Sequence, residues 1–339
     1  MVPSAGVRAA RAVLGRAIEE RTFPSAVAEV GESHGVLWRE AFGTLTFDDA
    51  APAAEEDTVF DLASLTKPIA TTSVVMQLVA DGALGLDEPV WASFEEWRGA
   101  DREAATVQDL LEHAAGLSPR LVDPPPPGRR EFEHDICTMP LEYMPRAKSI
   151  YGDLGFILLG FLVADRGRRS LAAQFDGVMA RQKRDTTDNG ILGNEMLTFT
   201  LLPGSLARTA PTRPMDEDVR RGRTLTGEVH DNYAAALGDS SVPVPFSPPL
   251  VARATMKSTA PGSSRALGWD TMLPTSSCGT EMSPAAFGHV GFTGTSVWID
   301  PILDRYFVLL TNRACGGGTL DKMRASRRAF HDALASGLS

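Results

Sequence analysis

Strand-like patterns at both ends of the chain constrain its fold most. Near the start, short apolar runs at residues 27–30 and 36–38 flank a glycine-containing turn and predict a β-hairpin. Near the end, residues 296–300 and 306–311 form a second predicted strand pair. Apolar residues at helical spacing precede the first pair and follow the second, so a helix is expected at each end. One antiparallel sheet built from both termini and flanked by the terminal helices accommodates all of these elements.

The middle of the chain carries mainly helical and loop-like patterns. We therefore expect an α/β fold in which residues 1–80 and 251–339 form an α/β sandwich domain and residues 81–250 form a mostly helical inserted domain. A chain of 339 residues is long enough for a large domain with such an insertion. Two stretches of the insert are predicted to be loops: residues 124–130, with four consecutive prolines, and residues 203–226.

Composition and charge narrow the classes of function. The formal net charge of -10 offers no electrostatic footprint for nucleic acid or for an anionic membrane surface. The longest apolar run, residues 156–164, is too short to span a bilayer. Cys137, Cys278 and Cys315 are widely spaced and the histidines are scattered, so neither a metal site nor a cofactor is expected. We expect a cytoplasmic protein that acts on a small molecule, and its oligomeric state stays open.

The S-x-x-K segment formed by Ser64 and Lys67 and followed by Pro68 carries the most chemical information. Apolar residues continue at helical spacing to about residue 80, and proline is tolerated only near the start of a helix. Ser64 is therefore predicted at a helix N-terminus, with Lys67 one turn further along the same side. The N-terminus favours negative charge on the serine oxygen, and a desolvated lysine with a lowered pKa can accept the serine proton.

Two further segments carry groups suited to a reactive site. Tyr151 and Asp153 precede an apolar helical pattern, which places the phenol in the turn before a buried helix. Residues 288–295 contain His289 and three glycines and lead into a predicted strand, so the backbone can approach a substrate closely there. Taken alone, Tyr151 is more simply a half-buried core tyrosine and His289 a structural histidine.

Two other motifs are weaker. Residues 31–35 match the G-x-S-x-G pattern of α/β-hydrolases around Ser33, but that pattern requires a strand-turn-helix elbow. Strands are predicted on both sides of Ser33, so it is not expected to be a nucleophile. Residues 316–318 are glycines without the G-K-[ST] continuation of a phosphate-binding loop.

The segments 64–67, 151–153 and 289–291 resemble, in order and spacing, the three motifs of the serine β-lactamase and penicillin-binding-protein superfamily. The resemblance is closest to its class C-like branch, which contains class C β-lactamases, D-Ala-D-Ala carboxypeptidases and family VIII carboxylesterases. Residues 107–117 are similar to the "LLxHtSGL" element of that branch, and residues 227–231 resemble a stretch found in some members. The resemblance spans most of the chain and implies a β-lactamase/transpeptidase-like fold.

The resemblance also implies roles for individual residues. Ser64 would be the acylated nucleophile, Lys67 its activating partner, and Tyr151 a general base or acid. Which of the lysine and the tyrosine takes the first proton stays open. The backbone N–H groups of Ser64 and Phe292 would form the oxyanion hole. The residues expected on the substrate-binding and oxyanion side of the site are Ser64, Asp153, His289, Gly291 and Phe292.

The sequence departs from the pattern of the superfamily at three places. Asp153 replaces the usual asparagine of the second motif, and its charge would raise the pKa of Lys67. His289 stands where class C β-lactamases have lysine, and a largely neutral imidazole is a weaker anchor for a substrate carboxylate. After Gly238 the chain continues into a proline-rich stretch, residues 243–249, so one wall of the site is expected to be shortened.

We therefore predict a serine hydrolase, most simply a carboxylesterase that acts on small acyl esters. A D-Ala-D-Ala carboxypeptidase or a weak β-lactamase using the same site is the nearest alternative. A non-catalytic sensor that resembles a penicillin-binding protein is an alternative of another class.

Overall fold

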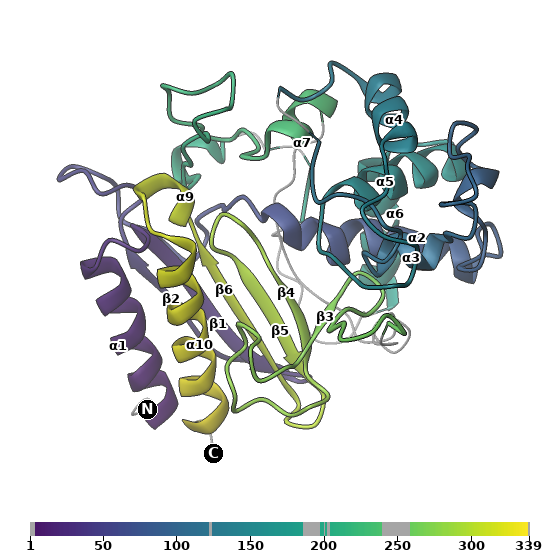
Figure 1. Ribbon diagram of the computed structural model, residues 1–339. Helices are drawn as coiled ribbons and strands as arrows, with labels where there is room; N and C mark the ends of the chain where they lie inside the picture. Colours follow the sequence, from purple (N-terminus) through teal and green to yellow (C-terminus); the bar gives the residue numbers. More distant parts are fainter. Residues whose placement is uncertain are drawn as a thin grey trace.

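The computed structural model describes residues 4–121, 124–185, 197–199, 201, 204–238 and 258–337. Its centre is a six-stranded sheet in the order β2-β1-β6-β5-β4-β3, and every paired strand runs antiparallel to its neighbour. The strands are β1 (Ser25–Glu32), β2 (Gly35–Gly43), β3 (Asp270–Thr271), β4 (Phe287–Val290), β5 (Ser296–Asp300) and β6 (Arg305–Thr311). The predicted α/β fold, with a sheet drawn from both ends of the chain, is confirmed (Figure 1).

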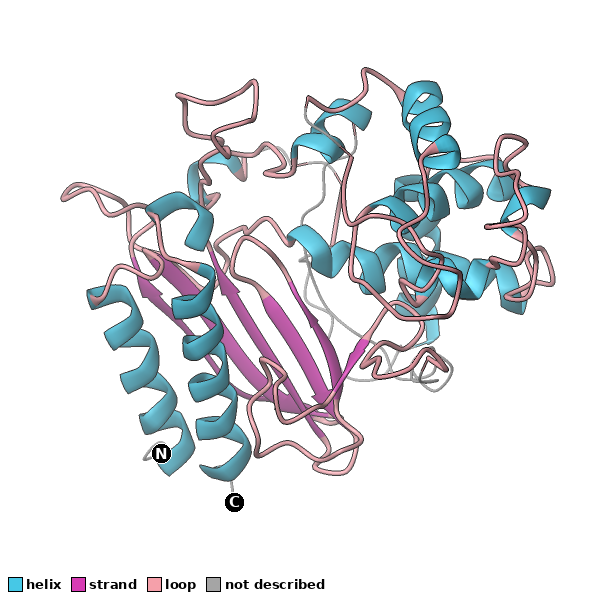
Figure 2. Cartoon of the chain, in the orientation of Figure 1, coloured by secondary structure: helices cyan, strands magenta, loops and turns pink. Residues whose placement is uncertain are grey.

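Pairing of β1 with β6 joins the two ends of the sequence in the middle of the sheet. In the register of this pair, Ala28 lies opposite Leu309 and Val30 lies opposite Phe307. The helices α1 (Ala5–Glu19) and α10 (Leu320–Gly337) lie side by side across one face of the sheet, as Figure 2 shows. The predicted terminal helices are therefore present and cover the sheet.

Successive residues of β1 serve two different cores, because side chains alternate between the faces of a strand. Ala28 and Val30 pack in the cluster that contains Leu14 of α1 and Phe330 of α10. Val27 belongs instead to the larger cluster, which extends through the helical region. The sheet is consequently buried on both faces, which explains the nearly continuous burial of β1.

The region between the N-terminal and C-terminal strands is mostly helical, as the sequence predicts. Its described elements are α3 (Val107–Leu111), α4 (Arg129–Thr138), α5 (Leu154–Gly167), α6 (Leu171–Asp185), α7 (Asn232–Leu237) and the short 3₁₀ turns η3 (Val90–Ala92) and η4 (Leu206–Arg208). A short helix, α9 (Arg313–Gly316), follows β6. The apolar helix α5 contributes buried side chains, among them Leu158 and Phe161, to the larger core.

The chain does not enter a regular α-helix directly at Ser64, which differs from the prediction. A 3₁₀ turn η1 (Ala63–Leu65) leads into a π-helical turn η2 (Lys67–Thr72), and only then does α2 (Ser73–Ala80) begin. Pro68 lies in the first turn of η2, where it has no N–H to donate and where its ring disfavours regular α-helical packing against the preceding turn. Ser64 nevertheless lies at the start of the helical segment, as expected.

Three expectations about other segments have different outcomes. Ser33 lies in the turn between β1 and β2, so the G-x-S-x-G match has no strand-turn-helix elbow. The proline-rich residues 243–249, with the shortened wall expected there, lie outside the described residues. Within the described part of the chain, no helix is both long and apolar enough to cross a membrane.

Candidate active site

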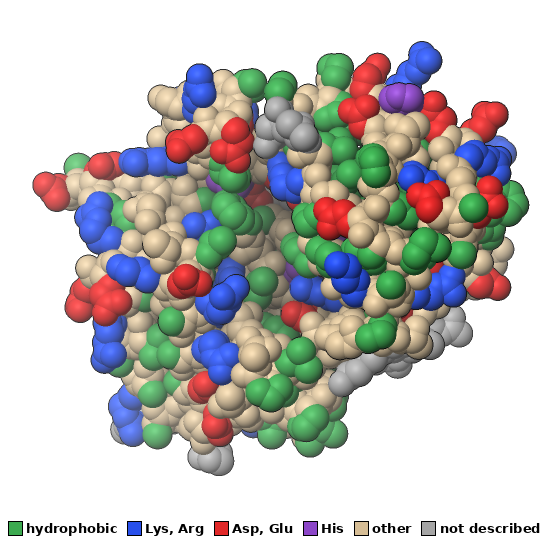
Figure 3. Space-filling view, in the orientation of Figure 1, with side chains coloured by type: hydrophobic (Ala, Val, Ile, Leu, Met, Phe, Trp, Pro, Cys, Tyr) green, Lys and Arg blue, Asp and Glu red, His purple; other side chains and the backbone are tan. Residues whose placement is uncertain are grey.

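The three predicted motifs meet where the sheet adjoins the helical region. Ser64 and Lys67 come from η1 and η2, Tyr151 and Asp153 precede α5, and His289 lies on β4. Figure 3 shows the molecular surface hollowed between the sheet side and the helical side of the molecule. Residues far apart in the sequence are thus brought to one place by packing of the helical region against the sheet.

Ser64 and Lys67 are in direct contact. The ammonium nitrogen Nζ of Lys67 donates a hydrogen bond to Oγ of Ser64 over 3.0 Å. Lys67 is buried. Ala63, which directly precedes Ser64, has a φ of 50°, in the left-handed region that non-glycine residues rarely occupy. Such strained backbone concentrates at functional sites.

Lys67 also forms an ion pair with Asp153, over 2.7 Å between Nζ and Oδ1. Burial by itself lowers the pKa of Lys67, but the Asp153 carboxylate outweighs this and holds the pKa well above its usual value. The expectation of a lowered lysine pKa is therefore wrong, whereas the expected effect of Asp153 is found. The resting site contains an ammonium group beside the serine hydroxyl.

The ring of Tyr151 is held among four other side chains. The rings of His113 and His289 have their centroids 4.7 and 5.6 Å from that of Tyr151. The guanidinium of Arg265 lies 4.7 Å and the ammonium of Lys67 lies 5.1 Å from the same ring centroid. With 36% of its surface exposed, Tyr151 is oriented by these contacts and still reaches solvent.

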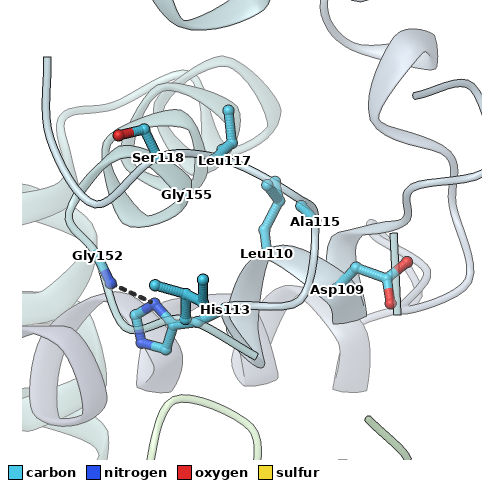
Figure 4. A pocket seen from close by; sticks show the side chains of 9 residues that line it. Asp109, Leu110, His113, Ala115, Leu117, Ser118, Gly152 and Gly155 are labelled. Atoms are coloured by element: carbon cyan, nitrogen blue, oxygen red, sulfur yellow. Dashed lines mark hydrogen bonds between the residues drawn. The ribbon is translucent and has the colours of Figure 1, made fainter. Parts of the chain in front are cut away.

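Both neighbouring histidines are buried and neutral. Burial, reinforced by the positive charge of Arg265, holds the pKa of His113 and of His289 well below the usual value. The Gly152 N–H donates to Nδ1 of His113 over 3.3 Å, as Figure 4 shows beside a small cavity. Nδ1 of His289 lies 2.8 Å from the carbonyl oxygen of Val290, so this nitrogen carries the proton.

The loop after β4 is fixed against the segment that carries Ser64. The hydroxyls of Thr293 and Thr295 donate to the carbonyl oxygens of Asp61 and Leu62 over 2.7 and 3.0 Å. A Cβ added at Gly291 would overlap with the Leu62 carbonyl and the Thr295 hydroxyl, so only glycine permits this approach. The close contact places residues 291–292 beside the start of η1.

Two arginine side chains donate hydrogen bonds to backbone carbonyl oxygens of the same loop. Arg313 donates to the carbonyl oxygen of Phe292 over 2.6 Å, and Arg327 donates to that of Gly291 over the same distance. The carbonyl oxygens of Gly291 and Phe292 are therefore both occupied by guanidinium donors, which fixes the backbone of this loop.

Sequence reasoning did not identify three residues of this site. His113 belongs to the recognised segment 107–117, but that motif does not predict the contact between its ring and the ring of Tyr151. Arg265 lies in a stretch of sequence in which no motif was recognised. Arg120 donates to Oδ2 of Asp153 over 2.9 Å. No local pattern marked Arg120, because Lys67 already compensates the charge of Asp153.

The remaining candidates lie outside the site. Ser33 is exposed and donates to Asp304 over 2.8 Å. Cys137, Cys278 and Cys315 are free and buried. Over the described residues, no group of three or more His, Cys, Asp or Glu side chains could hold a metal ion.

Replacing Gly291 with alanine should destabilise the protein. The added Cβ has to displace backbone of the Ser64 segment, and such overpacking costs about 1–3 kcal/mol of unfolding free energy. Urea denaturation measures this cost. Gly160→Ala is the matched control, because a Cβ at Gly160 on α5 meets nothing within 4 Å. Equal stability of both variants would mean that the loop is not pressed against the Ser64 segment.

Acid should destabilise the protein below pH 6.5. Burial lowers the pKa of four histidines. The pKa of His113 and of His289 falls well below its usual value, the pKa of His230 falls to about 4, and the pKa of His331 falls to about 3. The unfolded chain then binds more protons, so each histidine costs about 1.4 kcal/mol per pH unit as the pH falls from 6.5 to its folded-state pKa. Asp61 partly offsets this loss, because burial raises its pKa to about 6.

Denaturant unfolding at several pH values measures this dependence. His331→Gln should reduce the slope by about one proton, whereas His34→Gln, at an exposed turn position, is the control. An unchanged slope in His331→Gln would contradict the assignment of a buried neutral imidazole.

Comparisons with known proteins agree with this site. A family model described as Beta-lactamase matches residues 10–330. The chain is 28% identical over 358 aligned residues to Esterase EstB of Burkholderia gladioli, covering 90% of each chain. It is 26% identical over 356 aligned residues to a provisionally assigned D-alanyl-D-alanine carboxypeptidase of Escherichia coli, covering 86% of this chain and 79% of the relative.

Solved structures show the same fold. A class C beta lactamase from Rhodobacter sphaeroides superposes with a TM-score of 0.71 at 20% identity, covering 96% of this chain and 98% of that one. EstCE1, a hydrolase with promiscuous acyltransferase activity, superposes with a TM-score of 0.72 at 17% identity, covering 98% and 99%. The superfamily inferred from the three motifs is therefore confirmed, and the chain belongs to the Beta-lactamase family of serine hydrolases.

Proposed function

We propose that this protein is a carboxylesterase that hydrolyses small acyl esters through an acyl-enzyme on Ser64. The observation that carries the proposal is the 3.0 Å contact between Ser64 Oγ and Lys67 Nζ, within a partly buried group of charges. A serine hydroxyl becomes nucleophilic when an adjacent group can take its proton. The esterase relative from Burkholderia gladioli supports the ester as the substrate class.

Acylation would proceed by attack of Ser64 Oγ on the ester carbonyl carbon. Lys67 is the group in hydrogen-bond contact with the serine, so we assign it as the acceptor of the serine proton, once it has released its own proton to solvent. Tyr151, held beside Lys67, would deliver its phenolic proton to the departing alcohol oxygen and take up the proton that Lys67 received from Ser64. The backbone N–H groups of Ser64 and Phe292 would bind the oxyanion. Water would then hydrolyse the acyl-enzyme by the reverse sequence of proton transfers.

The third motif supports neutral substrates. His289 is buried, with 2% of its surface exposed, and its lowered pKa keeps the imidazole uncharged. A neutral imidazole lacks the charge with which a lysine would attract a substrate carboxylate. Esters without a carboxylate next to the reacting bond therefore suit this position.

Replacing Ser64 with alanine should abolish ester hydrolysis. With p-nitrophenyl butyrate as substrate, we expect kcat/KM to fall by about a thousandfold or more, because the nucleophile is removed. Ser33→Ala is the matched control, since Ser33 is exposed in the turn between β1 and β2. Full activity in the Ser64 variant would overturn the proposal.

A second candidate function is supported by Arg265. Its guanidinium lies against the Tyr151 ring, and Asp270, its acidic partner among the described residues, is 3.9 Å away, beyond hydrogen-bond distance. This cation could bind the carboxylate of a D-Ala-D-Ala peptide or of a β-lactam. The provisionally assigned carboxypeptidase of Escherichia coli is in line with this alternative.

Parallel assays separate the two functions. We expect a D-Ala-D-Ala peptide and nitrocefin to be turned over at least about a hundredfold more slowly than p-nitrophenyl butyrate. Two results together would favour the peptidase. The wild type would release D-alanine efficiently, and Arg265→Met would raise KM about tenfold more for the peptide than for the butyrate. A covalent adduct that forms and persists would instead indicate a non-catalytic sensor.

A further inference from the structure

We propose that Arg120 is a positioning residue that controls how readily Lys67 releases its proton, by sharing the carboxylate of Asp153. The inference rests on the proposed reaction at Ser64. It concerns a residue outside the three motifs, which acts on the proton acceptor through an intermediate side chain.

The carboxylate of Asp153 is divided between two cations. Oδ1 accepts from Lys67 over 2.7 Å, and Oδ2 accepts from Nη1 of Arg120 over 2.9 Å. Asp153 lies at the N-terminus of α5, but its side chain does not cap that helix, so both oxygens are directed to the cations. Its backbone N–H donates to the carbonyl oxygen of Pro119 over 2.9 Å, which ties Asp153 to the segment that carries Arg120.

Arg120 is itself fixed by the start of α7. Nη1 donates to Asp231 over 3.1 Å, and Nη2 donates to Asn232 over 2.6 Å. The guanidinium also lies 3.9 Å from the ring centroid of Tyr233. Asp231 caps α7, because its Oδ1 accepts the N–H of Ala234 over 2.8 Å. A guanidinium held in this way presents one N–H group to Asp153 in a fixed direction.

The fixed guanidinium weakens the hold of Asp153 on Lys67. A carboxylate that already neutralises one cation attracts a second cation less strongly. Among the described residues, the titratable groups that interact with Lys67 include His113, Tyr151, Asp153 and His289. Arg265 lies against the Tyr151 ring, and Arg120 is connected to Lys67 through Asp153. Arg120 acts within this group through its direct ion pair with Asp153.

Removing Arg120 should therefore make Lys67 a poorer proton acceptor. The loss of a positive charge and the release of the second Asp153 oxygen both strengthen proton binding by Lys67. Because the lysine has to lose its proton before it accepts that of Ser64, the reaction should require a higher pH. If Arg120 only stabilised the fold, removing it would lower activity whether or not residue 153 carries a carboxylate.

The test measures labelling of Ser64 by a fluorophosphonate with intact-protein mass spectrometry, between about pH 6 and 10. This readout does not depend on ester turnover. We compare Arg120→Met with Arg120→Lys, which keeps the charge but loses the planar fork. At fixed pH, we expect Arg120→Met to label about tenfold more slowly for each unit by which the pKa of Lys67 rises. Arg120→Lys should show a smaller loss.

The decisive comparison repeats Arg120→Met in an Asp153→Asn background. There the shared carboxylate is absent, so the loss caused by Arg120→Met should largely disappear. An equal loss in both backgrounds, or a loss that follows a lowered thermal stability, would overturn the proposal. If wild-type Ser64 is labelled but no ester is hydrolysed, the esterase function is overturned. The labelling rates of the Arg120 variants then still decide the role of Arg120. No labelling of the wild type would overturn both.

Discussion

A buried ammonium group at Lys67 is the constraint on which the candidate site depends. Removing this charge from water is costly unless a negative group compensates it, and Asp153 does so at 2.7 Å. Asp153 is in turn paired with Arg120, and Arg120 with Asp231. The charges alternate in sign from η2, past the start of α5, to the start of α7. One line of ion pairs therefore aligns the nucleophile segment with two helices of the inserted region.

The sheet supplies the other half of the site. Antiparallel pairing brings β1 beside β6 and, two strands further, places the end of β4 next to the Ser64 segment. Contact is close because Gly291 has no side chain and because Thr293 and Thr295 bond to backbone carbonyls of that segment. The helical segments hold the groups proposed to transfer protons, and the sheet holds the loop proposed to bind the oxyanion. Their relative position decides whether the site can react.

Much of this arrangement could be predicted from local patterns. Short apolar runs identified β1, β2, β5 and β6, and helical spacing identified α5 directly after Tyr151 and Asp153. The order of the three motifs was sufficient to identify the superfamily. The π-helical turn after Ser64 was missed, because no simple periodicity distinguishes it from an α-helix. Desolvation alone predicts a lowered pKa for Lys67, whereas the charge of Asp153, whose effect the sequence also indicates, raises that pKa above its usual value.

The sequence by itself determined the family, the strands at both ends and the identity of Ser64, Lys67 and Tyr151 as candidates. These follow from residue type and spacing, which act over a few turns of the chain. Only the tertiary structure decided that Arg120 contacts Asp153 and that Arg265 lies over Tyr151. Contacts between segments separated by tens or hundreds of residues depend on how helices and sheet pack. Electrostatic interactions depend on those distances and on burial, so the charge state of the site is a property of the folded molecule.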